Sequence, residues 1–575
     1  MISTERPHPD VPHPATPGPP SVEVRGVPLR PRGRSAADAF RFDGGLRAPL
    51  PLVTSWAFSL SNSRCAADGR SPIPSTPARG CTSITRLPSS SGARPGVLTS
   101  LNVFRTAFRP ALPASRAASR WKALAVLSLL QCLIAVDVTV VNVALPSIGA
   151  DLGAGPAALA WVVTGYALVG GGLLLLGGRI ADLLGRRRVF LAGAALFGLS
   201  SLLAAAAPDL PTLVAARFGQ GAGEALASPA AMSLIALLFT EPSERARALG
   251  VWGAISGLGM AGGVLLSGVL TELLHWRWIF LVNLPVTAAV LALTPRLVRA
   301  DRAPERRGGL DVPGAVLLTA GPLALVFGVL QAAHRPWNDL AVALPVVGGV
   351  AALAAFVLVE HRSRRPLVPL SFFANRTRTV ANAATVLLSA ALSTTFFIVT
   401  LYLQDVLGFT PLQAGLAYLP FCAVLLVTLV LTEKVIGKLG MKSTALAGLL
   451  ASALGAGLLS RLPVDGNLWI DVLPGMIAMA AGMALGLIAL QNAALHGVTE
   501  QDAGIASGVQ RSVDQLGGAL GLAVLVGTAT AIAAHAPGDI AAQTDGFRVA
   551  FRCALVAVTA AAVGFSILAR NPHQD

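Results

Sequence analysis

The strongest constraint on the fold of this chain is a series of apolar windows, each long enough to cross a bilayer. A hydrocarbon core roughly 30 Å thick requires about 20 helical residues. Fourteen windows meet that length: 122–145, 158–178, 189–207, 211–239, 247–270, 276–297, 311–332, 337–359, 379–401, 411–432, 442–462, 469–492, 504–533 and 547–568. Helices satisfy their own backbone hydrogen bonds in lipid, so the windows predict an all-α polytopic membrane protein with 14 transmembrane helices.

Composition and charge support this prediction and exclude several classes of function. Charged residues make up 13% of the chain, against about 25% in soluble proteins. The net charge is +15, and between the apolar windows the arginines lie in short connectors, a topology signal that argues against nucleic-acid binding. No Walker loop, Ser/His/Asp set or metal-ligand spacing is present, and the five cysteines lie far apart. We therefore expect no enzyme and no metal site.

The first part of the chain differs in composition from the rest. Residues 1–118 are rich in Pro, Arg, Ser and Gly and show no apolar period. We expect this N-terminal extension to be disordered, because it cannot bury enough apolar surface to offset the entropy of ordering. The alternative is a start site assigned too early, with initiation near Val97 or Val103.

Lysine and arginine are distributed unevenly between alternate connectors. If the N-terminus is cytoplasmic, 20 of them lie in the inside connectors and tail and five lie outside: Arg277, Arg335, Arg461, Arg548 and Arg552. The positive-inside rule then predicts a multi-pass protein of the cell (cytoplasmic) membrane with both termini in the cytoplasm.

Once the connectors and the ends of the windows are set aside, five charged residues remain inside the predicted spans: Asp137, Arg217, Glu224, Arg511 and Asp514. A charge near the bilayer centre costs roughly 2.5–3.5 kcal/mol on insertion scales, so each one indicates a functional hypothesis. Asp137 either carries a proton or is a buried carboxyl bonded to Asn142 or a helix neighbour. Arg511 and Asp514 lie one turn apart, a spacing that favours a pair with each other.

Arg217, Gln220, Gly221 and Glu224 follow i, i+3, i+4, i+7 spacing and so share one helix face. One interpretation is an Arg217–Glu224 pair within the helix that only neutralises charge. The other is that the face lines a central cavity, where Glu224 changes protonation during transport and Arg217 couples that charge to the conformation.

Six stretches occur in an order typical of one transporter family. They are "VDVTVVNVALPSI", "GGRIADLLGRRRV", "RFGQGAGEALASPAAM", "WRWIFLVNLPV", "LYLQDVLGFTPLQAGLAYLP" and "AGIASGVQRSVDQLGGALG". Together they resemble the major facilitator superfamily, and more narrowly the fourteen-span drug:proton antiporters of the EmrB/QacA type. Asp137, Asn142, Arg217 and Gln220 match family motif positions, as do Gly178, Arg179, Asp182, Gly185 and Arg186.

The resemblance implies a major facilitator fold of two pseudo-symmetric six-helix bundles plus two linker helices. The expected bundles are 119–300 and 376–575, with the linker at 301–375. It also implies secondary active transport: proton-coupled efflux of drugs or other amphipathic small molecules, with antibiotic resistance as the outcome. Asp137, Asn142, Arg217, Gln220 and Glu224 would serve proton coupling and the substrate cavity. No cofactor is expected beyond the proton gradient, and we expect a monomer, with an accessory export partner left open.

The fifth window departs from the family pattern. Antiporters carry a Gly-Pro where this chain has Gly263-Val264, and the missing proline keeps an alternative open, a proton-coupled uptake symporter of a small solute. In the thirteenth window (504–533), Arg511 and Asp514 stand where we expect an amide and an arginine. Gly253/Gly257 and Gly259/Gly263 still form small-xxx-small pairs, which predict close helix packing.

The connector 179–188 is predicted to form a cytoplasmic gate. Topology explains its arginines but not the acid Asp182, and Gly178 and Gly185 suit tight turns or close backbone approach. The resemblance places this loop opposite the start of the thirteenth window (504–533), near "QDAGIASG". We therefore expect Asp182 to rest against that positive helix end when the cytoplasmic side is closed, with Arg179 and Arg186 holding its geometry.

Asp182→Asn tests this gate. Loss of a charge–helix contact worth about 0.3–1 kcal/mol should shift the protein toward the inward-open state. The measurement is the labelling rate of a cysteine placed on the cytoplasmic side, together with the transport rate. Unchanged labelling and unchanged transport would contradict the gate.

Overall fold

The computed structural model describes residues 114–301, 311–333, 335–363, 366–498, 503–536 and 538–569. Within these ranges the regular structure is helical. The helices are α2 (Ala114–Leu152), α3 (Pro156–Leu184), α4 (Arg186–Ala205), α5 (Leu210–Leu238), α6 (Pro242–Leu273), α7 (Trp278–Leu281), α8 (Asn283–Leu297), α9 (Val312–Gln331), α10 (Leu340–Arg362), η1 (Leu370–Ala374), α11 (Arg376–Leu401), η2 (Tyr402–Val406), α12 (Pro411–Ala417), α13 (Leu419–Leu439), α14 (Met441–Leu459), η3 (Leu468–Val472), α15 (Leu473–Ala494), α16 (Ala503–Ala533) and α17 (Ile540–Leu568).

The predicted fourteen spans are confirmed in the described part of the chain. Fourteen helical stretches are long and apolar enough to cross a membrane, and some combine two elements, such as α7 with α8 and α12 with α13. Several begin earlier than expected: α6 starts at Pro242 rather than 247, and α2 starts at Ala114, inside the extension predicted to be disordered up to 118. Residues 1–113 lie outside the described residues.

Polar caps set where several of these helices start. Asp209, Asp311, Asp339 and Asn375 each precede a helix, and each side chain accepts a backbone N–H of the first turn. Such caps satisfy amides that have no partner within the helix. The caps place the boundaries where short polar connectors interrupt the apolar sequence.

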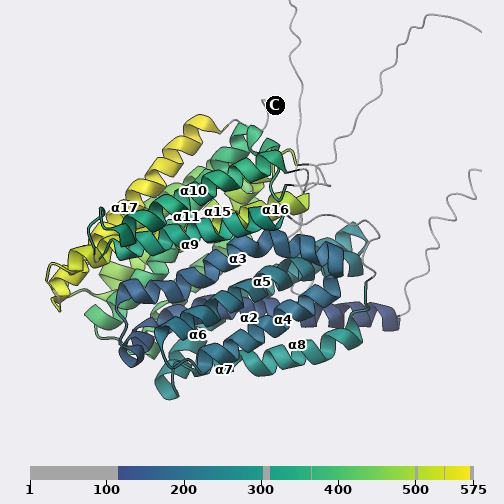
Figure 1. Cartoon of the computed structure of the whole chain (residues 1–575), viewed down its shortest axis with the longest axis horizontal. Helices are drawn as coiled ribbons and strands as arrows, with labels where there is room; N and C mark the ends of the chain where they lie inside the picture. The colour runs from purple at the N-terminus through teal and green to yellow at the C-terminus, as the bar shows by residue number, and fades with distance from the viewer. Residues whose placement is uncertain are drawn as a thin grey trace, which may run out of the picture. The chain divides into compact units, whose positions relative to one another are not determined.

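The helices pack in two groups that touch along two seams. In the first group α5 packs against α3 and α4, and α2 packs against α6; in the second, α14 contacts α15 and α17, and α11 contacts α16. Figure 1 shows α2 to α8 together below α9, α10, α11, α15, α16 and α17. The groups meet where α3 runs along α16 and where α6 contacts α12. Helix α9 pairs with α10, and it also contacts α3 and α16. The boundaries at 300 and 375 stay a prediction.

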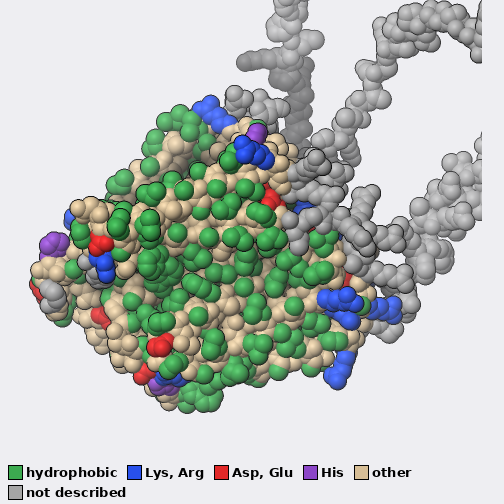
Figure 2. Space-filling model, in the orientation of Figure 1, with side chains coloured by type: hydrophobic (Ala, Val, Ile, Leu, Met, Phe, Trp, Pro, Cys, Tyr) green, Lys and Arg blue, Asp and Glu red, His purple; other side chains and the backbone are tan. Residues whose placement is uncertain are grey.

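On the face of the molecule that Figure 2 shows, charged side chains are distributed as in a protein that spans a bilayer. Figure 2 shows hydrophobic side chains across the middle of one face, while Lys, Arg, Asp, Glu and His side chains lie at its margins. Blue side chains gather at the end where α2 begins. A belt free of charge with charged rims is the distribution expected of helices that span a membrane.

Glycines of α6 allow a very close approach to α2. A Cβ at Gly263 would lie 2.8 Å from the Val136 carbonyl oxygen, and one at Gly259 would lie 2.7 Å from the Cys132 carbonyl oxygen. Gly259 and Gly263 therefore lie where two backbones come close, as small-xxx-small pairs allow. A Cβ at Gly257 would lie 3.4 Å from a Leu426 methyl carbon of the second helix group, an ordinary contact. Gly253 is half-buried.

The connector expected at 179–188 is much shorter than predicted. Gly185 alone separates α3 from α4, with φ +97°, so Arg179 and Asp182 lie in the last turns of α3. The expectation of a tight turn or close approach at Gly178 was wrong: Gly178 lies inside α3, and a Cβ there would meet Pro229 at an ordinary 3.7 Å. The close approach occurs at Gly177, where a Cβ would collide with the Ala225 carbonyl oxygen.

Gly263→Ala and the neighbouring control Gly262→Ala test the α2–α6 contact. The first should lower the melting temperature in detergent, because the added methyl overpacks the interface at a cost of about 1–3 kcal/mol. The second points into open space and should leave stability unchanged or slightly raised. Equal melting temperatures for the two variants would contradict the close contact.

Candidate functional site

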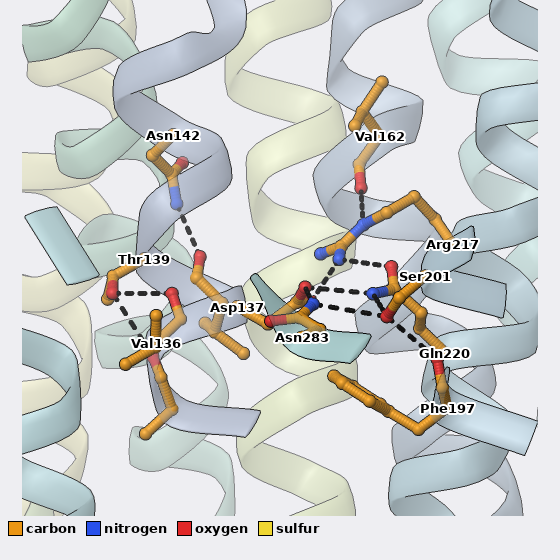
Figure 3. Close-up of polar contacts among 12 residues, drawn as sticks. Val136, Asp137, Thr139, Asn142, Val162, Phe197, Ser201, Arg217, Gln220 and Asn283 are labelled. Carbon is orange, nitrogen blue, oxygen red and sulfur yellow. Dashed lines mark hydrogen bonds and ion pairs between the residues drawn. The ribbon is translucent and has the colours of Figure 1, made fainter. Parts of the chain in front are cut away.

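Asp137 of α2 lies at the centre of a fully buried polar network (Figure 3). Its Oδ2 accepts from Arg217 Nη1 in a short ion pair, and its Oδ1 accepts from Gln220 Nε2 at 2.9 Å and from Asn283 Nδ2 at 2.9 Å. The donors come from α5 and from the start of α8. The carboxylate is therefore ligated by two other helices of the first group.

The Arg217 side chain also contacts residues of α3 and α5 in the same helix group. Its Nε donates to the Val162 carbonyl at 2.8 Å, and its Nη1 also donates to Gln220 Oε1 at 2.8 Å. The guanidinium carbon lies 4.4 Å from the centroid of the Tyr166 ring of α3, a cation–π distance. Arg217 and Gln220 lie one turn apart on α5, which explains why both reach the same carboxylate.

The network corrects two interpretations from the sequence. Arg217 pairs with Asp137 rather than with Glu224 on its own helix. Asn142 does not bond to Asp137: its Nδ2 donates to the Val138 carbonyl at 2.9 Å, and Figure 3 shows it on a neighbouring turn of α2, apart from the network. Spacing along one helix could not reveal these partners, because the ion pair joins two helices.

Ser201 and Asn283 belong to this network, and the sequence reasoning missed both. Ser201 Oγ accepts from Gln220 Nε2 at 2.9 Å and from Asn283 Nδ2 at 3.2 Å, and donates to the Phe197 carbonyl at 2.9 Å. Each is a polar residue within an apolar run, "LFGLSS" for Ser201 and "WIFLVNLPV" for Asn283. An uncharged polar side chain in a span is a weak signal, because serine also satisfies itself on its own helix.

Glu224 lies one turn beyond Gln220 on α5 and reaches the second group of helices. Its Oε1 accepts from Gln515 Nε2 at 3.1 Å and lies 3.6 Å from Arg511 Nη2, both on α16. Arg511 was expected to pair with Asp514, but the described contacts are different: Arg511 faces Glu224, and Asp514 Oδ1 accepts from Ser389 Oγ of α11 at 2.5 Å.

The gate residues gather around the turn at Gly185. Arg186 reaches back one turn, with its Nη2 3.1 Å from Asp182 Oδ1, and Arg187 Nη1 donates to the Val298 carbonyl at 3.0 Å. Half of the Asp182 side chain is exposed, and Arg179 is exposed. Residues 499–502, which precede α16, lie outside the described residues, so the contact of Asp182 with the start of α16 stays a prediction.

Asp301 holds this turn, and the sequence reasoning did not identify it. Its carboxylate accepts the backbone N–H of Arg186 at 2.7 Å and that of Arg187 at 3.1 Å. It therefore caps the N-terminus of α4 from a distant part of the chain. Partial burial raises the pKa of Asp301, but the two backbone amides outweigh burial, so the pKa lies below its usual value.

Comparison with known proteins agrees with this arrangement. The sequence matches the family described as the Major Facilitator Superfamily over residues 127–522, which is more than half of the chain. The chain belongs to the Major Facilitator Superfamily. Members of this family are membrane transporters rather than enzymes, and the protein is a multi-pass membrane protein.

Three curated relatives align over most of their length. The Lincomycin resistance protein of Streptomyces lincolnensis is 50% identical, over 81% of this chain and 94% of its own. The Puromycin resistance protein pur8 of Streptomyces alboniger is 39% identical over 79% and 93%. The Cephamycin export protein CmcT of Amycolatopsis lactamdurans is 39% identical over 76% and 91%.

Solved structures share the fold at low sequence identity. A crystal structure of an auto-inhibited POT family peptide transporter superimposes with a TM-score of 0.60, at 14% identity, over 79% of this chain and 99% of its own. A bacterial homologue of the human lysosomal transporter Spinster, in an inward-facing conformation, gives 0.57 at 17% identity over 79% and 97%. These likenesses support the fold class alone.

Asp301→Asn tests the cap at the α3–α4 turn. Because the folded carboxyl has a lowered pKa, its contribution to stability is present above the unfolded value of about 3.9 and is lost as pH falls. Loss of the charged cap should cost about 1 kcal/mol at pH 7. Thermal unfolding in detergent should show a lower melting temperature for the variant at pH 7 and a shrinking difference toward acid pH. A difference independent of pH would contradict the charged cap.

Proposed function

We propose that this transporter exports small amphipathic molecules across the cytoplasmic membrane, driven by proton influx and by alternating access. The observation that carries export is the alignment with relatives named for lincomycin resistance, puromycin resistance and cephamycin export over more than nine-tenths of their length. The excess of basic side chains at the end where α2 begins supports a cytoplasmic location for both termini. The protein acts as a monomer in this proposal.

Asp137 is the proposed proton-carrying group. It is completely buried, and its negative charge is balanced by Arg217. Protonation removes that charge and leaves the guanidinium buried without a counter-ion. The buried partner would then be destabilised by about 3–5 kcal/mol.

This energy is large enough to change a conformational equilibrium. A shift of about 1.4 kcal/mol is a factor of ten, so about 3–5 kcal/mol corresponds to roughly two to three and a half orders of magnitude. A full switch from 1:99 to 99:1 needs about 5.5 kcal/mol. One protonation event at Asp137 therefore supplies most of the drive for a change in state, provided that Arg217 finds new partners in the other state.

Contacts between the two helix groups support alternating access from one closed end. At the end opposite the α3–α4 turn, the Leu412 N–H donates to Glu272 at 2.8 Å and Gln404 Nε2 donates to the Val143 carbonyl at 2.8 Å. At the same end a Cβ on Gly268 would lie 2.8 Å from the Pro411 carbonyl oxygen. With the positive-inside orientation, this joined end faces the outside.

Asp137→Asn tests the proton coupling. The variant keeps the shape of the side chain but cannot exchange a proton, so we expect proton-driven export in proteoliposomes to fall at least about a hundredfold. Since a lone buried Arg217 destabilises the fold, Asp137→Asn combined with Arg217→Gln serves as a control that removes both charges. The double variant should recover stability without recovering proton-driven export.

Proton-driven export that survives in both variants would contradict the role of Asp137. The direction of the pH change caused by substrate in inverted vesicles separates export from the alternative, uptake by symport. In inverted vesicles, antiport moves substrate into the lumen and protons out of it. An uptake symporter moves substrate and protons together, in the same direction across the vesicle membrane.

A further inference from the structure

The contact between α5 and α16 leaves one buried carboxylate only partly paired. Glu224 faces the Arg511 guanidinium, whereas Asp514 is bonded to Ser389 of α11. The Asp137–Arg217 pair nearby is already neutral by itself. Because a buried carboxylate is costly without a full set of partners, Glu224 is complementary to a cation that bonds it more completely than Arg511 does.

A run of glycines in α3 brings the relevant atoms to one point. A Cβ at Gly170 would lie 3.2 Å from Gln515 Oε1 and 3.4 Å from Glu224 Oε2. Both oxygens therefore border the same small volume, one from α16 and one from α5. Gln515 is oriented by its Nε2, which donates to Glu224 Oε1 at 3.1 Å.

Three polar atoms at this point have no hydrogen-bond partner. Among the described residues, Glu224 Oε2, Gln515 Oε1 and the Tyr166 hydroxyl have no hydrogen-bond partner. Glu224 is completely buried, and Tyr166 is 3% exposed. Tyr166 lies close to Glu224, and its ring lies beside Arg217 of the Asp137 network. Carboxylate and amide oxygens accept hydrogen bonds, so a group rich in N–H donors fits here and an anion does not.

Arg511 pairs with Glu224 only partly. Its Nη2 lies 3.6 Å from Glu224 Oε1, beyond the distance of a good hydrogen bond, and it leaves Oε2 without a partner. Half of its side-chain surface is exposed, against 1% for Glu224. Arg511 is thus a loosely held counter-ion that another cation can replace.

We propose that Glu224 Oε2 and Gln515 Oε1 form a subsite for a protonated amine of the transported molecule, and that Arg511 is the internal cation that this amine displaces. The subsite rests on the proposed function and adds a substrate class to it: amphipathic molecules with an ammonium group. Because the two acceptors belong to different helix groups, the bound amine joins α5 to α16. Asp137 then remains the proton site, and Glu224 serves substrate recognition.

Two fluorescent probes test the subsite in the purified full-length protein. Dansylcadaverine ends in a primary amine, and its N-acetyl derivative has the same dansyl group without that charge. Fluorescence titration in detergent at pH 8 should show the amine binding at least about tenfold tighter, a difference of about 1.4 kcal/mol. The N-succinyl derivative, which ends in a carboxylate, should bind the weakest.

Three variants assign the preference to residues. Glu224→Gln should abolish it while leaving the affinity for the N-acetyl probe intact, which also reports correct folding. Arg511→Gln should tighten amine binding about tenfold, since the competing cation is gone. Glu360→Gln is the matched control: Glu360 of α10 is also a buried glutamate with one oxygen lacking a partner, and this variant should keep the preference unchanged.

Several outcomes would overturn the subsite. They are no binding or no amine preference in the wild-type protein, a preference that survives Glu224→Gln, or tightest binding of the N-succinyl probe, which would assign the site to anions at Arg511. Measuring proton-driven transport of the N-acetyl probe distinguishes failure of the subsite from failure of the proposed function. Transport without amine preference refutes only the subsite, and amine preference without proton-driven transport refutes only the proton coupling.

Discussion

The ion pair between Asp137 and Arg217 is the interaction on which the polar interior of the first helix group depends. In a chain whose helices lie in lipid, a lone aspartate or arginine at this depth would be expelled or would recruit water. Paired, and bonded to Gln220 and Asn283, the two charges become a neutral unit that links α2, α5 and α8. The same unit also makes the packing of these helices sensitive to a single proton, because neutralising one partner leaves the other unbalanced.

Close backbone approach is what allows such polar contacts to form at all. Gly259 and Gly263 of α6 bring its backbone against α2, and the glycines of α3 admit both α5 and α16. Side chains as short as aspartate, serine and asparagine can then reach one another between helices. Small residues therefore set the distance between neighbouring helices, and a few polar residues form hydrogen bonds and ion pairs across it.

The sequence predicted the helices better than it predicted their partners. All fourteen spans were found from apolar length alone, and the residues with charges in spans were identified correctly as unusual. Their pairing was wrong in two places, because spacing along one helix favours local partners. Arg217 and Arg511 both form ion pairs with acidic side chains on other helices. Asp301, which caps α4 from a distant part of the chain, has no sequence signal at all.

The sequence by itself determined the fold class, because apolar length and the need to satisfy backbone hydrogen bonds in lipid leave few alternatives to a helical bundle. Motif order determined the family in the same way, from local stretches. Only the tertiary structure decided which acid meets which arginine, that one residue rather than a loop separates α3 from α4, and that two acceptors from different helix groups border one point beside Gly170. These features depend on contacts between residues up to 291 positions apart, and such contacts are set by how the helices pack.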